Sequence, residues 1–252
     1  MDGSSSGRRV GRVVGLWRYP VKSMAGEALA EADISWNGLA GDRRWAFIRD
    51  GVPQSGFPWL TLRERADLGR YQPSFAEPGR PDKSRTAVRS PLGATFDVAD
   101  AALADELWPG GVRAVRYDRG IFDTFPLSLV TTQAIARLGQ GVGAHLDVRR
   151  FRPNIVVEAA DEAAFAEDDW IGCVLRIGEM SMRVDKRDGR CAVITIDPVT
   201  MERDPAILRW VANHREGCVG VYGSTVEPGR VALYDAVLLK SAARPQRAAG
   251  PA

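Results

Sequence analysis

The sequence has 252 residues, of which 45% are hydrophobic and 26% charged, and its 34 Lys and Arg nearly balance its 32 Asp and Glu. This composition predicts a sizeable hydrophobic core, arranged as one large domain or two small ones. It excludes intrinsic disorder, collagen-like repeats and a small disulfide-stapled fold. The net charge of +2, with no strongly basic segment, also argues against nucleic-acid binding.

Cysteine usage and hydropathy bear on the cellular location. The three widely spaced cysteines, Cys173, Cys191 and Cys218, argue against a disulfide framework and for a reducing compartment. The polar start of the sequence lacks the apolar core of a signal peptide. No apolar stretch reaches the roughly 18 residues that a membrane span needs. We therefore expect a cytoplasmic protein without a membrane span.

In the first half, short β-branched segments bounded by turn residues predict strands. These strands cover residues 10–17, 44–48, 86–89, 94–98 and 112–117. Asp100 is placed to cap a helix that ends at Leu107, before a Pro and Gly segment. The composition then shifts at residues 117–120, which predicts a boundary between two halves.

In the second half, two helices are marked by their capping residues. Thr131 or Thr132 caps a helix that Gly139 ends, and Asp204 caps another that begins at Pro205. Strands are expected at 155–158, 174–177, 180–184, 191–196, 220–226 and 231–239. Many short strands with isolated helices indicate an α+β or barrel-type fold rather than a doubly wound parallel sheet. The small polar residues of 241–252 predict a disordered tail.

Two weak functional signals favour plain structural interpretations. Residues 139–144 match G-x-G-x-x-A, but a helix rather than a strand precedes them, so a helix end is favoured over a dinucleotide site. With only His145 and His214, histidine-rich zinc sites and most histidine-based catalysis lack their residues. His214 lies in the last turn of its predicted helix, where a cation interacts favourably with the helix dipole. The role of His145 is left undecided by its neighbours in sequence.

The residues around Cys191 admit two interpretations. Cys191 follows Lys186-Arg187-Asp188-Gly189-Arg190, which we expect to be a flexible cationic loop. Nearby positive charge favours the thiolate, the form that attacks electrophiles and binds soft metals. A buried, inert cysteine is an equally good interpretation from these residues alone.

Two clusters place positive donors where the chain turns. Lys22 and Ser23 follow the first strand, an arrangement suited to a phosphate oxygen. Arg149, Arg150 and Arg152 precede a strand, where forked guanidinium donors can hold a phosphate. A solvated surface patch is the alternative for either cluster.

Taken in order, several motifs resemble the MOSC family, named for the C-terminal domain of molybdenum cofactor sulfurase, with its companion N-terminal β-barrel domain. The resemblance extends from about residue 10 to residue 239. The motifs are Y-P-V-K-S at 19–23, G-L-A-G-D-R-R-W at 38–45, L-R-E at 62–64, F-R-P-N-I-V-V at 151–157, F-A-E-D-D-W at 165–170, G-R-C at 189–191, I-D-P at 196–198 and G-V-Y-G at 220–223.

The resemblance implies an α+β, β-rich fold: a mixed, barrel-like N-terminal domain at 10–117 and a MOSC-type β-barrel with flanking helices at 118–240. It implies a molybdopterin-type molybdenum cofactor, with Cys191 as both metal ligand and catalytic residue. The soft dithiolene of the pterin and a protein thiolate are suitable ligands for molybdenum, and cationic side chains suit the phosphate group of the cofactor. The implied cofactor-binding residues are Lys22, Ser23, Arg43, Asp123, Thr124, Arg152, Arg190 and Tyr222.

Similarity to the amidoxime-reducing branch implies an oxidoreductase that reduces small N-hydroxylated or related N–O compounds. The sequence lacks the C-x-x-x-x-C-x-x-C spacing of a ferredoxin-like domain, so a separate ferredoxin- or flavoprotein-like protein is expected to donate electrons. The alternative is a non-redox carrier of sulfur or molybdenum cofactor, with Cys191 holding a persulfide or the metal transiently. A third hypothesis, a decayed cofactor site, is disfavoured because Lys22, Arg43, Arg152 and Cys191 are all present.

Overall fold

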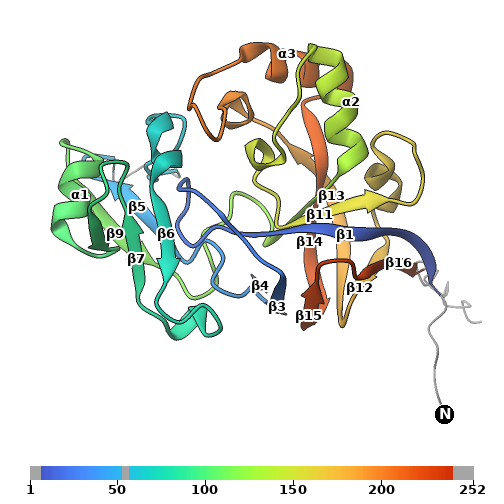
Figure 1. Cartoon of the computed structure of the whole chain (residues 1–252), viewed down its shortest axis with the longest axis horizontal. Coiled ribbons are helices and arrows are strands. Elements are labelled where there is room, and N and C mark those ends of the chain that lie inside the picture. The colour runs from blue at the N-terminus through green and yellow to red at the C-terminus, as the bar shows by residue number, and fades with distance from the viewer. Residues whose placement is uncertain (1–6, 53–56, 241–252) are drawn as a thin grey trace, which may run out of the picture.

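The computed structural model describes residues 7–52 and 57–240 of the chain. Strands dominate, and helices are few (Figure 1). The view shows two parts: the N-terminal half with α1 (Ala101–Leu107) on the left, and a barrel topped by α2 (Thr132–Val142) and α3 (Pro205–Arg215) on the right. The predicted α+β, β-rich class, with a MOSC-type barrel and flanking helices, is confirmed.

Seven strands close the barrel in the order β11-β10-β14-β13-β12-β16-β1, and pairing between β1 and β11 completes the ring. Neighbouring strands are antiparallel except β10 and β11, which are parallel. The barrel strands are β1 (Arg8–Arg18), β10 (Leu127–Thr131), β11 (Ile155–Ala159), β12 (Val174–Ile177), β13 (Met180–Gly189), β14 (Cys218–Glu227) and β16 (Ala236–Lys240).

Strand β1 lies between β11 and β16, so the beginning of the described chain completes a barrel built mostly from the second half. Its register shifts between Arg9 and Gly11 and again between Val13 and Gly15, which allows the long strand to curve. A Cβ atom at Gly11 would lie 2.6 Å from the carbonyl oxygen of Glu158. Glycine therefore permits the close approach of β1 to β11.

The N-terminal half contains three small sheets, in the orders β15-β3-β4, β5-β9 and β6-β7-β8. One of their strands, β15, comes from the C-terminal part of the chain and ties the two halves together. Their strands, with β2 beside β1, are β2 (Glu27–Ala28), β3 (Glu31–Ser35), β4 (Gly38–Leu39), β5 (Trp45–Arg49), β6 (Gln72–Phe75), β7 (Thr86–Arg89), β8 (Thr95–Asp97), β9 (Val112–Arg116) and β15 (Gly229–Ala232).

The buried hydrophobic side chains form three cores, and successive residues of a strand can belong to different cores. On β11, Ile155 and Val157 point into the barrel core, whereas Val156 packs on the outside against the core under α2 and α3. The third core fills the N-terminal half, where Leu103 and Leu107 of α1 are completely buried. Both faces of β11 are covered, which explains its continuous apolar sequence.

Helix capping follows the sequence closely. Ala102, Ala134 and Ala206 donate their backbone N–H groups to the side chains of Asp100, Thr131 and Asp204, the residues that precede α1, α2 and α3. Helix α2 continues past Gly139, so most of the G-x-G-x-x-A match is helical.

Within the two described segments, no helix is long and apolar enough to cross a membrane. The 3-10 turns are η1 (Ala66–Arg70), η2 (Pro81–Lys83), η3 (Val148–Phe151), η4 (Ala166–Trp170) and η5 (Ala192–Thr195).

Two predictions around Cys191 are wrong. Residues 186–189, expected in a flexible loop, continue β13, where Lys186 pairs with Tyr222 and Gly189 with Cys218 on β14. Residues 191–196, expected as a strand, instead form the 3-10 turn η5 after Cys191. Buried Ile194 and Ile196 gave this turn a strand-like apolar pattern.

Two further differences concern strands of the second half. The single strand predicted at 231–239 is two strands, β15 and β16. Between them the chain turns at Tyr234, which has a φ of 72°. Strand β10, which is buried throughout, was not predicted. The disordered tail expected at 241–252 lies outside the described residues.

Candidate functional site

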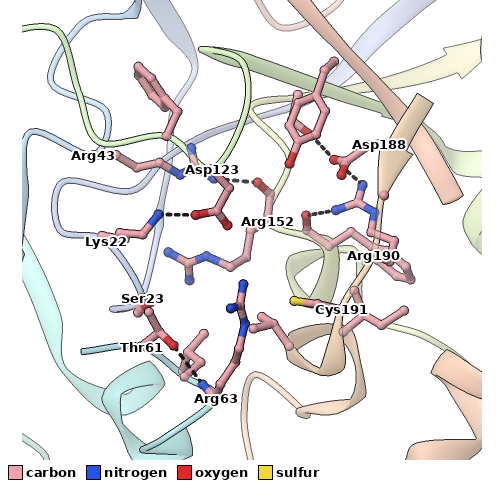
Figure 2. A pocket seen from close by; sticks show the side chains of 18 of the residues that line it. Lys22, Ser23, Arg43, Thr61, Arg63, Asp123, Arg152, Asp188, Arg190 and Cys191 are labelled. Atoms are coloured by element: carbon pink, nitrogen blue, oxygen red, sulfur yellow. Dashed lines mark hydrogen bonds and ion pairs between the residues drawn. The ribbon is translucent and has the colours of Figure 1, made fainter. Parts of the chain in front are cut away.

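A pocket of about 800 Å³, open solvent included, contains residues from both halves of the chain. Figure 2 shows it from close by, with Lys22 and Arg43 on the left, Cys191 and Arg190 on the right, and the side chains of Arg152 and Arg63 between them. Thr124 is exposed and is not among the lining residues. The pocket brings together the other eight residues named from the sequence: Lys22, Ser23, Arg43, Asp123, Arg152, Arg190, Cys191 and Tyr222.

Arg43 and Arg152 form the innermost positive group. Their Cζ atoms lie 4.7 and 4.2 Å from the ring centroid of Tyr19, which is buried. Arg43 also donates from Nη2 to the carbonyl oxygen of Arg152 at 3.0 Å, and its Nη1 pairs with buried Asp42. Arg152 donates from Nη1 to the Met24 carbonyl at 2.7 Å, but its Nη2 is buried without a partner in the described chain.

Burial is the main electrostatic influence on this group. It lowers the pKa of Arg152 to about 10, with Arg43 acting in the same direction, so Arg152 still carries its charge at neutral pH. Burial raises the pKa of Tyr19 to about 12, which keeps its hydroxyl neutral. The inner end of the pocket therefore holds two guanidinium charges, of which Arg43 pairs with Asp42, while Asp123 acts on both without forming an ion pair with either.

Three of the residues named from the sequence have left-handed backbone conformations. Ser23, Arg43 and Arg152 have φ values of 68°, 49° and 50°. Such conformations are uncommon for residues other than glycine and cluster at functional sites. The surrounding structure holds them: Arg43 donates its backbone N–H to the Tyr19 carbonyl at 2.7 Å, and Arg152 donates to that of Arg149 at 3.1 Å.

Lys22 and Asp123 form an ion pair at the side of the pocket, with 2.5 Å between Lys22 Nζ and Asp123 Oδ1. The Lys22 side chain is 7% exposed and that of Asp123 48%. Burial lowers the pKa of Lys22, and Asp123 acts against this shift. Burial by itself would raise the pKa of Asp123. The positive charges of Lys22, Arg43 and Arg63 outweigh this effect and hold the pKa below its usual range.

Arg190 is occupied by contacts that hold the end of β13. It donates from Nε to the Val219 carbonyl and from Nη1 to that of Phe151, both at 2.8 Å. Its Nη2 lies 2.8 Å from Asp188 Oδ2, close enough for an ion pair although not aligned for a hydrogen bond. These contacts position the residue next in sequence, Cys191.

Cys191 contributes a free thiol, partly buried, to the pocket wall. It directly precedes η5, so the change from strand to turn presents its side chain toward the cationic group rather than along the sheet (Figure 2). The other free cysteines, Cys173 and Cys218, lie outside the pocket. Within the described segments, no group of three or more His, Cys, Asp or Glu side chains is placed to hold a metal ion.

Tyr222 and Asp188 form the wall beside Cys191. Burial, together with the charge of Asp188, raises the pKa of Tyr222, so its hydroxyl stays protonated. Asp188 is 1% exposed and accepts a hydrogen bond from Ser128 at 3.0 Å, while its Oδ1 has no partner by hydrogen-bond geometry. Burial raises the pKa of Asp188 as well. The ring of Phe125 packs 6.3 Å from that of Tyr222.

Arg149, Arg150 and Arg152 were expected to form one cluster, but the structure separates them. Arg149 pairs with Asp147 and lies outside this pocket. Arg150 lines it but pairs with Asp197 at 2.6 Å. Only Arg152 remains without an acidic partner in the described chain.

Several lining residues were not assigned a site role from the sequence. Asp188 lay within the charged run before Cys191, which was the one available signal. Arg63 was part of the L-R-E motif but carried no assignment. Phe57, Thr61, Phe122 and Phe125 also line the pocket and had no assignment.

Comparison with known proteins gives consistent matches. The model of the MOSC N-terminal beta barrel domain matches residues 10–97, and that of the MOSC domain matches residues 116–238. Molybdenum cofactor sulfurase of Caenorhabditis briggsae is 24% identical over 86% of this chain, which spans only 34% of that relative. Mitochondrial amidoxime reducing component 2 of Macaca fascicularis is 35% identical, with 77% of this chain and 69% of the relative covered.

A solved structure, YUAD protein from Bacillus subtilis, resembles the fold with a TM-score of 0.50. The match covers 93% of this chain and 98% of that one at 14% sequence identity, so it bears on the fold alone. The two family models together cover most of the sequence, in the same order as the two halves described above. On these matches, the chain belongs to the MOSC family.

Proposed function

We propose that this pocket holds a molybdopterin-type molybdenum cofactor and that the protein is an oxidoreductase acting on N-hydroxylated or related N–O compounds. The observation that carries the proposal is the presence, in one pocket, of a guanidinium, that of Arg152, whose Nη2 is buried without a partner in the described chain, and of a free thiol, Cys191. The names of the relatives, amidoxime reducing component and molybdenum cofactor sulfurase, support the same cofactor.

The residues present fit the two chemically different ends of such a cofactor. Lys22, Ser23, Arg43 and Arg152 offer N–H and O–H donors for a phosphate group. A phosphate oxygen would satisfy Arg152 Nη2 and neutralise the excess positive charge beside Tyr19. A thiolate is a soft ligand suited to molybdenum, and Cys191 is the thiol that the pocket provides.

The bound cofactor would supply two-electron chemistry. In the proposed reaction a compound R–NH–OH takes up two electrons and two protons, its N–O bond breaks, and R–NH₂ and water are formed. The chain's own contribution is to anchor the phosphate through Arg43 and Arg152, to hold the thiol at the end of β13 through Arg190, and to limit solvent access. A separate ferredoxin- or flavoprotein-like protein would donate the electrons.

The test is reduction by purified protein produced in a host that makes the cofactor. We expect about one molybdenum per chain and steady-state reduction of benzamidoxime with a chemically reduced low-potential dye as electron source. Molybdenum-replete protein that reduces no hydroxylamine- or amidoxime-type compound would contradict the reductase proposal.

The relative named molybdenum cofactor sulfurase supports a second candidate function, that of a carrier. A carrier of sulfur or molybdenum cofactor would use the same anchoring residues but would release its load. It predicts transfer of cofactor to an apo-acceptor enzyme within minutes and no turnover of N–O compounds. Tight, non-exchanging molybdenum together with turnover would exclude this alternative.

A further inference from the structure

Arg63 is the second arginine of the pocket without an acidic partner in the described chain, and unlike Arg152 it is exposed to solvent. The described contact of its guanidinium is with the ring of Phe57, whose centroid lies 4.7 Å from Cζ. A cation on an aromatic face keeps its N–H edges available for another ligand. Arg63 therefore retains the capacity to bind an anion.

Apart from Arg152, the other cations that line the pocket form ion pairs with carboxylates. Lys22 pairs with Asp123, Arg43 with Asp42, Arg150 with Asp197 and Arg190 with Asp188. Arg63 helps to hold the pKa of Asp123 low, but the two side chains form no ion pair within 4 Å. Among the described residues, the exposed lining cation that lacks a carboxylate partner is thus Arg63.

The backbone at Arg63 is tied to the segment that follows Cys191. Thr61 Oγ1 accepts the backbone N–H of Arg63 at 3.2 Å and donates to Glu64 at 2.5 Å. Arg203 donates from Nη2 to the carbonyl oxygens of Leu62, at 2.9 Å, and of Arg63, at 3.2 Å. In Figure 2 the Arg63 side chain extends from this anchor into the pocket, on the side where Cys191 lies.

The chemistry around Arg63 indicates what it would bind. Phe57, Phe122 and Phe125 line the same pocket and offer contacts for an aromatic body. The buried group of Arg43 and Arg152 is sufficient for a cofactor phosphate, whereas Arg63 faces the solvent from which substrates arrive. An exposed guanidinium without an acidic partner in the described chain suits the carboxylate of an incoming ligand.

We infer that Arg63 is a specificity-determining residue that binds a carboxylate on an aromatic N–O substrate of this pocket. This inference rests on the proposed reductase function and adds a substrate class to it. The carboxylate is held by the Arg63 guanidinium, and the aromatic ring contacts the phenylalanines that line the pocket.

The kinetic test compares benzamidoxime with 4-carboxybenzamidoxime, which differ by one carboxylate. Wild-type protein is expected to show a higher kcat/KM for the carboxylated compound, through a lower KM. In Arg63→Gln this preference falls roughly tenfold, the size expected for loss of one charge-assisted hydrogen-bonded pair. Arg63→Lys restores part of it, since it keeps the charge without the forked geometry.

Lys186 provides a matched control. It is also an exposed cation beside an aromatic ring, 6.0 Å from the centroid of Phe125, but it is not a lining residue. Lys186→Gln should leave the preference for the carboxylated substrate unchanged. An equal loss in both variants would mean that general positive charge attracts the substrate and would overturn the assignment to Arg63.

A binding measurement separates this inference from the proposed activity. 4-Carboxybenzamide has no N–O bond and cannot be turned over in this way, so its affinity for the purified protein is measured by calorimetry with benzamide as reference. We expect tighter binding of the carboxylate and about tenfold weaker binding in Arg63→Gln. Equal affinity for both probes in the wild type contradicts the inference even if benzamidoxime is reduced.

The remaining kinetic outcomes are also decisive. If carboxylate binding depends on Arg63 but no N–O compound is reduced, the proposed reductase function fails and the anion site stands as a property of the pocket alone. If Arg63→Gln instead raises the KM for a protein electron donor and affects both substrates equally, Arg63 serves partner docking and the inference is wrong.

Discussion

Arg43 and Arg152 share the ring of Tyr19 although they are 109 residues apart in the chain. Each has a left-handed backbone, and the Arg43 guanidinium donates to the Arg152 carbonyl. Of these two like charges, only Arg43 forms an ion pair within the described chain, with Asp42; Asp123 also acts on both charges but is itself paired with Lys22. Such a cluster costs free energy when no anion is bound. Their arrangement is best explained by an anion that binds between the halves.

Replacing Arg152 should separate cofactor binding from stability. In Arg152→Gln we expect cofactor content, measured as molybdenum per chain, to fall at least tenfold. The free energy of unfolding of cofactor-free protein, measured in urea, should stay within about 1 kcal/mol of wild type, because a buried unpartnered charge is removed along with one hydrogen bond.

Arg150→Gln is the control for this experiment. Arg150 lines the same pocket but pairs with Asp197 and donates to the Thr195 carbonyl. Its loss should lower the free energy of unfolding by about 2 kcal/mol. A reversed order, with Arg152→Gln the less stable variant, would show that Arg152 is mainly structural.

The role of Cys191 can be tested without any substrate. If its thiolate is the protein ligand of molybdenum, Cys191→Ala should lose most of the metal, or bind it with an altered X-ray absorption spectrum that lacks one sulfur ligand. Cys218→Ala removes a free, partly buried cysteine outside the pocket and should retain the wild-type metal content. Equal molybdenum content and identical spectra in the two variants would exclude the ligand assignment.

The Lys22–Asp123 pair should make stability depend on pH in the acid range. The pKa of Asp123 is held below its ordinary value of 3.8, so its contribution is fully present above that value and is lost as the pH falls through the lower folded pKa. Asp123→Asn should therefore be less stable than wild type at pH 7, by about 1 kcal/mol or less because Asp123 is half exposed. This gap in unfolding free energy should close below pH 3.8.

Asp118→Asn is the matched control for this titration. Asp118 is 87% exposed and lies 3.3 Å from Arg116, outside the pocket. Its substitution should change the free energy of unfolding by less than about 0.5 kcal/mol across the same pH range. A gap for Asp123→Asn that persists unchanged at low pH would mean that its effect is not electrostatic.

Two glycines near Cys191 allow backbone strain to be separated from steric conflict. Gly217 and Gly220 have φ values of 75° and 76°. A Cβ at Gly217 would meet nothing within 4 Å, whereas one at Gly220 would lie 2.7 Å from the Leu129 carbonyl oxygen and 3.2 Å from Arg190 Nη2. Gly217→Ala should cost about 1 kcal/mol of stability, and Gly220→Ala at least twice that. Similar losses in both would show that the barrel relaxes around Gly220.

Local chemistry was readable from the sequence. The caps at Asp100 and Asp204 were predicted, and that of the second helix was narrowed to Thr131 or Thr132, because a side-chain oxygen that accepts from the first helical turn needs only neighbours in sequence. The turn at Tyr234 was missed because a bulky residue with positive φ gives no Gly or Pro signal. Turn η5 was mistaken for a strand because short apolar segments look alike in either structure.

The candidate site was accessible through its motifs, but the roles of its charges were not. Lys22, Arg43, Arg152 and Cys191 were named in advance, and the structure places them in one pocket. Which cations are already paired depends on acids such as Asp197, 47 residues from Arg150. Sequence alone could not separate Arg150 from Arg152, nor show that Arg63 has no acidic partner among the described residues, because these properties come from long-range packing.

The closure of the barrel by β1 has a consequence for the order of events in biosynthesis. The strand at Arg8–Arg18 pairs with the nearby Glu27–Ala28, but its partners in the barrel are Ile155–Ala159 and Ala236–Lys240, so its full set of hydrogen bonds forms only after more than two hundred residues have been made. The residues that line the pocket extend from Lys22 to Tyr222, so the pocket is complete only after both halves have been synthesised. A ligand that needs the whole pocket therefore binds late in the folding of the chain.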